Sequence, residues 1–271
     1  MNANVFFMEL RRHRRVILIW CAVLLVLNAF MMFFYPIVIE SGVFQQMDSF
    51  FSNPFFKGMM TTFGVDLENM TSPLGYYVTY NAVYTMLLGS LVAILLGGRL
   101  VAREEKEKTA EFLLTKPVTR GEVLNSKMAA LAVLVTGLNV VVVLAGFIML
   151  EIFSDAPYDV GAFLTVSWQT WLLTLAFGAV GFLVAALAKR ARAVTGASLG
   201  IVLGFYIVSG LSRISESTRA IGFISPFRFV QTDIVAGAPD GGWWRAAYFI
   251  GLAAVCVLVS HIVYRRKDIL L

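Results

Sequence analysis

Long apolar stretches separated by polar or mixed segments dominate the chain. A helix needs about 20 predominantly apolar residues to cross the hydrocarbon core of a bilayer, so each stretch predicts one membrane span. The first span is predicted to end at Pro36. The six predicted spans are residues 16–35, 78–96, 128–150, 168–188, 193–211 and 245–264. The pattern therefore predicts an all-α integral membrane protein, with a single transmembrane domain over residues 1–271.

Composition supports this class and excludes others. Of 271 residues, 59% are hydrophobic and 14% are charged, and the mean hydropathy is +0.78. A water-soluble domain could not bury that much apolar surface. Cys21 and Cys256 both fall inside predicted spans, which implies no disulfide framework. His13 and His261 are too few and too far apart for a metal site.

The basic residues predict the orientation of the spans. Lysines and arginines favour cytoplasmic loops, and an arrangement with both termini in the cytoplasm places 17 of the 22 there. The net charge of +5 thus reflects helix ends and not a nucleic-acid-binding patch. Arginines in the external segment 212–244 depart from this rule, and we expect Arg219, Arg228 and Arg245 to pair locally or to contact lipid phosphates. Residues 2–10 are expected to form an interfacial helix on the cytoplasmic leaflet.

The segment between the second and third spans is the most charged part of the chain. Seven basic and five acidic residues lie between Arg99 and Lys127. Its first part has a moderately amphipathic helical pattern, and Pro117 predicts that this helix ends at Lys116. Thr119 and Glu122 have the spacing of a capping box, which predicts a second helix that runs into the third span. The segment is therefore expected to be structured and suited to docking a soluble partner.

This segment resembles the cytoplasmic loop of type-two ABC-transporter permeases. The matching elements are the acidic pair Glu104-Glu105, the run from Thr109 to Leu114, Pro117 to Arg120, and Lys127. The family pattern has glycine where this chain has Lys108, and the other positions fit. The resemblance implies a coupling helix that contacts a separate ATPase subunit. The residues that it assigns to this contact are Arg103, Glu104, Glu107, Thr109, Ala110, Glu111, Leu113, Leu114, Pro117 and Arg120.

The resemblance also implies a function. It indicates a permease subunit that exports amphipathic or hydrophobic compounds across the cell membrane of a prokaryote. Such a subunit pairs with a second permease half, expected to be an identical copy, and with two ATPase subunits that bind ATP and magnesium. This chain would bind no cofactor or metal and catalyse no reaction.

Other features of the sequence also indicate that the energy for transport comes from a different protein. No ionisable residue lies near the middle of a predicted span, which argues against a self-contained ion-coupled carrier. Residues 121–127 lack the second glycine of a nucleotide-binding loop, and no hydrolase or metalloprotease motif is present. An alternative remains a non-transporting membrane scaffold or sensor whose charged loop recruits a cytoplasmic regulator.

Two further features are candidates for transport roles. Asn28, Asn81 and Asn139 lie inside predicted spans, where they would line a substrate path or hydrogen-bond between helices. Gly196, Gly200 and Gly204 recur every four residues on one face of the fifth span. Such a face lets helix backbones approach closely, either within the chain or at the seam of a dimer. The external segment 37–77 is rich in phenylalanine and methionine, consistent with either ordinary packing or a lid for a hydrophobic substrate.

Overall fold

The computed structural model describes residues 2–42, 70–107, 119–154, 156–188, 190–213, 216–232 and 242–266. Every regular element in these ranges is helical. The elements are α1 (Ala3–Glu40), α5 (Pro73–Asn81), the π-helix η1 (Ala82–Leu88), α6 (Gly89–Glu107), α8 (Arg120–Phe153), α9 (Val160–Leu187), α10 (Ala191–Leu211), three short 3₁₀ helices η2 (Glu216–Thr218), η3 (Ile221–Ile224) and η4 (Pro226–Phe229), and α11 (Trp243–Arg266).

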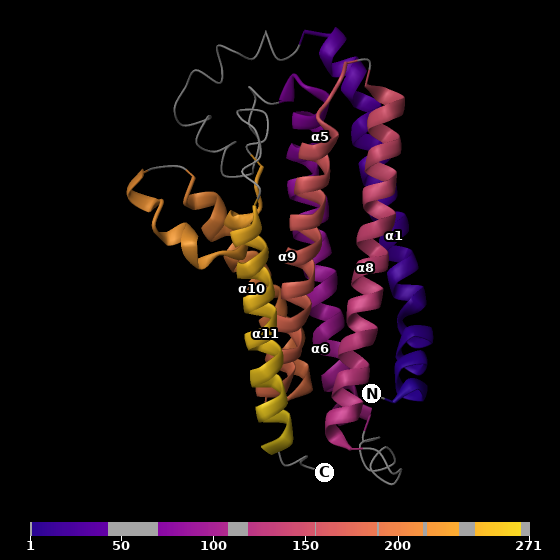
Figure 1. Cartoon of the computed structure of the whole chain (residues 1–271), viewed down its shortest axis with the longest axis vertical. Helices are drawn as coiled ribbons and strands as arrows, with labels where there is room; N and C mark the ends of the chain where they lie inside the picture. Colours follow the sequence, from indigo (N-terminus) through magenta and orange to yellow (C-terminus); the bar gives the residue numbers. More distant parts are fainter. Residues whose placement is uncertain are drawn as a thin grey trace.

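Six of the helical stretches are long and apolar enough to cross a membrane. One of them is built jointly by α5, η1 and α6, which follow one another without a break. The prediction of an all-helical protein with six membrane-spanning helices is therefore confirmed for the described residues. The start of α1 and the last turn of α11 lie at the same end of the bundle (Figure 1).

Side-chain caps set several helix starts. Asn2 accepts hydrogen bonds from the N–H groups of Asn4 and Val5, which would otherwise be unsatisfied at the start of α1. At the start of α8, the Glu122 carboxylate accepts from the Thr119 N–H at 3.0 Å, and the Thr119 hydroxyl oxygen accepts from the Glu122 N–H at 3.3 Å. The predicted capping box is therefore present.

The first helix differs from the predictions in two respects. α1 does not end at Pro36 but continues to Glu40. A proline inside a helix removes one backbone hydrogen bond, and neighbouring helices in a membrane bundle can compensate for that loss. Residues 3–10 are the first turns of this continuous helix and form no helix of their own, and their position at the membrane interface stays a prediction. With 38 residues, α1 is about 57 Å long, far more than the hydrocarbon core requires.

α9 is the central helix of the bundle. It packs most extensively against α6 and α11 and also contacts α8 and α10, while α1 packs along α8. In Figure 1, α1 and α8 accordingly lie on one side of α6 and α9, and α10 and α11 on the other. Buried aliphatic and aromatic side chains fill the space between the helices in two clusters, one around Phe177 and one around Leu131.

Glycines allow α6 and α9 to approach each other closely. A methyl group added at Gly97 would overlap the carbonyl oxygen of Gly178, and one added at Gly181 would overlap the carbonyl oxygen of Ile94. Side-chain-free positions of this kind let helix backbones touch. No sequence pattern had predicted packing at these glycines.

Candidate functional site

The charged segment between α6 and α8 is described only at its two ends. Arg103, Glu104 and Glu107 belong to the last two turns of α6, and Arg120 is the first residue of α8; the structure describes their backbone but not their side chains. Thr109, Ala110, Glu111, Leu113, Leu114 and Pro117 lie outside the described residues. The predicted coupling helix therefore stays a prediction.

A buried ionic contact lies where this segment meets the helix bundle. The Lys127 side chain, only 2% exposed, starts on α8 and donates a hydrogen bond to the carbonyl oxygen of Leu100 on α6. The Lys127 Nζ atom is also 3.9 Å from a carboxylate oxygen of Glu9 on α1. Charged groups are seldom buried unless they are paired, so Lys127 and Glu9 favour staying together. Their contact and the hydrogen bond to Leu100 connect α8 to both α1 and α6.

One further contact attaches the start of α1 to α8, and another lies within α1 beside Glu9. The Ser126 hydroxyl oxygen on α8 accepts a hydrogen bond from the Asn2 N–H at 2.8 Å. His13 donates from Nδ1 to the Glu9 carbonyl oxygen at 3.1 Å, and the same nitrogen is 3.5 Å from the Glu9 carboxylate. We call the set Asn2, Glu9, His13, Ser126 and Lys127 the junction cluster. It links the start of α1 to the helices on both sides of the charged segment.

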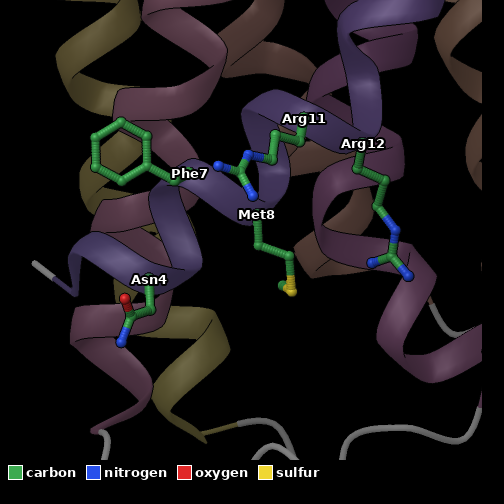
Figure 2. Close-up of a pocket in the computed structure, with 5 residues that line it drawn as sticks. All are labelled: Asn4, Phe7, Met8, Arg11 and Arg12. Atoms are coloured by element: carbon green, nitrogen blue, oxygen red, sulfur yellow. The ribbon is translucent and has the colours of Figure 1, made fainter.

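The outward side of the same part of α1 is mixed apolar and basic. A surface hollow of about 590 Å³ lies here. Figure 2 shows the side chains that line it, which come from successive turns of α1. Its lining residues are Asn4, Phe7, Met8, Arg11 and Arg12. Phe7 is 57% exposed although it is aromatic, and such a surface is typical of helices at a membrane–water boundary.

The three asparagines proposed for a substrate path are all buried, but they differ in their surroundings. Asn28 donates to the Leu24 carbonyl oxygen of its own helix at 2.8 Å. Asn81 is the last residue of α5, directly before the π-helix η1. π-Helices are rare and often mark functional sites, and no sequence pattern had indicated this one.

Asn139 lines an apolar groove between α8 and α9. Its amide donates to the Thr174 hydroxyl oxygen across the helix pair at 2.9 Å. Trp171 donates to the Thr136 hydroxyl oxygen at 3.0 Å and thereby fixes its ring at the same surface. The groove has a volume of about 450 Å³, and neither Asn28 nor Asn81 lines it. Its residues are Thr136, Asn139, Val140, Val143, Leu144, Leu164, Ser167, Trp168 and Trp171.

The predicted glycine stripe faces away from the rest of the chain. Gly196, Gly200 and Gly204 are exposed on α10, and a methyl group added at any of them would meet no atom within 4 Å among the described residues. Of the two interpretations of this stripe, packing within the chain is therefore not found in the described part. No described part of the chain covers the stripe.

Potential metal ligands do not gather in the described ranges, where no group of three or more histidine, cysteine or acidic side chains is found.

The family comparison decides the class of this protein. The family model described as "ABC-2 family transporter protein" matches residues 3–269, nearly the whole chain. The chain belongs to the ABC-2 transporter family. It is therefore a multi-pass membrane subunit of an ABC transporter, as the charged segment had suggested. No curated protein matches the chain.

Within this ABC-2 protein, sequence reasoning identified Lys127 by its place in the family pattern but missed Glu9 and His13. A signal for both exists in α1. Its buried residues recur every three or four positions, at Glu9, His13, Ile17, Cys21, Leu24, Asn28, Met32 and Tyr35. Extending the apolar stripe toward the N-terminus in steps of four leads to His13 and Glu9.

Proposed function

We propose that this chain is the permease subunit of an ABC exporter for amphipathic or hydrophobic compounds, driven by a separate ATPase subunit. The match to the ABC-2 family over residues 3–269 carries the proposal. Both termini and the segment 103–120 would face the cytoplasm, where the ATPase is found. The protein would lie in the plasma membrane of a prokaryote.

The junction cluster supports a route for force. Closure of the ATPase subunits on ATP would push on the segment 103–120, which joins α6 to α8. Because Lys127 contacts both Leu100 and Glu9, movement of the start of α8 would carry α6 and α1 with it. Displacing three spans together would switch access to the substrate path.

The groove beside Asn139 supports the substrate class. Its volume lies within the range of pockets that hold drug-sized molecules. Aliphatic and tryptophan side chains form most of its wall, and Thr136, Asn139 and Ser167 add polar groups. This combination suits a compound with a large apolar part and few polar groups.

Changes of charge in the charged segment test the coupling role. Glu111→Lys and Leu113→Asp are each expected to leave the protein in the membrane at a normal level but to weaken ATPase binding at least tenfold. An unpaired charge buried at an interface costs several kcal/mol, whereas a single charge on a solvated surface changes folding by about 1 kcal/mol or less. The measurement is copurification of the ATPase together with transport.

Asn139→Ala is the matched control for this experiment. It removes one hydrogen bond between α8 and α9, a contact of the kind that contributes about 0.6 kcal/mol on average in a membrane protein. It should leave ATPase binding intact and alter at most the substrate preference. Full ATPase binding and transport in both loop variants would instead mean that the segment is a solvated connector.

The exposed glycine stripe supports assembly as a homodimer through α10. Gly200→Leu is expected to reduce the dimeric fraction, measured by mass photometry or crosslinking, by at least half. Gly251→Leu on α11 is the control, because a methyl group added at either glycine meets no atom within 4 Å in the described chain. A loss of dimer in the Gly200→Leu variant alone would therefore support a contact with a second molecule at α10. An unchanged dimer fraction in Gly200→Leu would exclude this seam.

A further inference from the structure

The segment between α10 and α11 projects from the side of the helix bundle over its described residues 216–232 (Figure 1). It is nevertheless attached to the bundle by specific contacts. The Ser225 hydroxyl donates to the Phe205 carbonyl oxygen at 2.6 Å, and the Gln231 N–H donates to a side-chain oxygen of Gln169 at 2.7 Å. Hydrogen bonds therefore fix this segment to the bundle, so it can hold side chains in defined positions.

Three arginines lie close together on this segment. The Arg228 guanidinium donates to the Arg219 carbonyl oxygen at 3.0 Å and to the Ser212 hydroxyl oxygen at 3.3 Å. Arg213, the neighbour of Ser212, donates to the Thr232 hydroxyl oxygen at 3.2 Å. We call Arg213, Arg219 and Arg228 the arginine cluster. Two of its guanidinium groups are thus held in place by neutral partners.

The arginine cluster has no acidic partner among the described residues. Its hydrogen bonds there go to hydroxyl and carbonyl oxygens only. Partial burial is the main cause that lowers the pKa of Arg228, and the positive charges of Arg219 and Arg213 lower it further. Arginine still remains charged at neutral pH, so three positive charges act on the same small region.

Exposed apolar side chains lie on the same segment as the cluster and at the start of α11. The Arg228 guanidinium lies 4.5 Å from the centre of the Phe223 ring, a cation–π contact. Ile221, Phe223 and Ile224 are each more than half exposed. Trp243 and Trp244, at the start of α11, are also exposed, and tryptophan is enriched where a membrane meets water. Positive charge beside exposed apolar groups matches the boundary between headgroups and acyl chains.

We propose that Arg213, Arg219 and Arg228 bind the phosphate headgroup of an anionic phospholipid, while Ile221, Phe223 and Ile224 contact its acyl chains. Guanidinium groups match phosphate oxygens in both charge and hydrogen-bond geometry. A free phosphate ion would use the arginines alone and leave the apolar residues exposed to water. With both termini in the cytoplasm, as in the proposed function, this lipid would lie in the outer leaflet; lipid binding itself does not rest on that orientation.

Binding of fluorescent phosphatidylglycerol to the purified full-length protein in neutral detergent tests this site. Arg219→Gln is the mildest variant, because only the backbone carbonyl of Arg219 is used inside the described structure. One arginine near a membrane surface corresponds to about a fivefold change in lipid affinity, so this variant should bind about fivefold more weakly. The triple variant Arg213→Gln, Arg219→Gln, Arg228→Gln should lose more than tenfold.

Matched controls separate a specific site from general charge. The double variant Arg190→Gln, Arg192→Gln removes two exposed charges at the start of α10 and should change the affinity less than twofold. Phosphatidylcholine should bind at least tenfold more weakly than phosphatidylglycerol to the wild type. Equal losses in the Arg219→Gln protein and in the control double variant, or wild-type affinity in the triple variant, would overturn the proposal.

Two further experiments show whether the site binds a lipid or a free phosphate ion, and whether it acts independently of ATPase binding. Inorganic phosphate at 100-fold excess over the lipid should displace little phosphatidylglycerol, and complete displacement would indicate a small-anion site instead. ATPase copurification with Arg219→Gln should equal that of the wild type. A failure of lipid binding is therefore distinguishable from a failure of the proposed coupling.

Discussion

Gly181→Leu is expected to remove most of the folded protein from the membrane. At Gly181 even a methyl group would overlap the carbonyl oxygen of Ile94, and it would lie 3.0 Å from the Gly98 nitrogen. These are backbone atoms, which cannot move aside by changing a rotamer. α6 and α9 would have to separate, and their contact is the most extensive in the bundle. Size-exclusion chromatography of the fluorescently tagged protein measures the loss.

A graded pair of variants gives the magnitude. Gly181→Ala should destabilise the protein by about 1–3 kcal/mol, the usual cost of overpacking a close-packed core. Gly137→Ala is the control, because a methyl group there meets nothing within 4 Å in the described structure. Its melting temperature should stay the same or rise slightly, since alanine favours the helix more than glycine does. Equal melting temperatures for the two alanine variants would contradict backbone-to-backbone packing at Gly181.

Lys127→Met is expected both to destabilise the protein and to weaken the coupling of ATP hydrolysis to transport. Removing one partner of a buried ion pair costs about 3–5 kcal/mol, because the other charge stays buried after it has lost its partner. Here Glu9 would keep the His13 Nδ1 atom, 3.5 Å from a carboxylate oxygen that has no hydrogen bond in the described structure. The carbonyl oxygen of Leu100 would also lose its contact with Lys127. Thermal unfolding and substrate-stimulated ATP hydrolysis are the two measurements.

A double variant separates these two effects. Glu9→Gln combined with Lys127→Met removes both charges and should recover most of the lost stability, as replacing whole buried ion pairs often does. If the junction cluster transmits force, ATP hydrolysis should stay poorly coupled to substrate even in the stable double variant. Additive losses of stability in the two single variants would show instead that Glu9 and Lys127 do not interact.

The sequence alone determined the class of the protein and the number of spans. Membrane burial requires about 20 apolar residues for each helix, and this requirement is local, so it can be read along the chain. Thr119 and Glu122 determined the start of α8 for the same reason, because a capping box joins residues only three positions apart. The charged segment with Lys127 indicated the family that the match over residues 3–269 established.

Pro36 shows where a local rule failed. Proline predicts a helix end because it lacks an N–H group, yet α1 continues to Glu40. Whether a helix accepts such a gap depends on what packs around it. Near this end of α1, the Tyr76 hydroxyl donates to the Met31 carbonyl oxygen and the Tyr35 hydroxyl donates to the Thr71 carbonyl oxygen. These contacts join residues distant in sequence.

Only the tertiary structure decided which small and polar residues touch across helices. Sequence periodicity selected the stripe at Gly196, Gly200 and Gly204, whereas the close backbone contacts within the chain lie at Gly97 and Gly181. Sequence periodicity also did not indicate the contact of Glu9 with Lys127. The two residues are 118 positions apart in the chain but adjacent in the bundle. Periodicity shows which residues share a face of one helix. Which faces meet depends on how all six helices pack together.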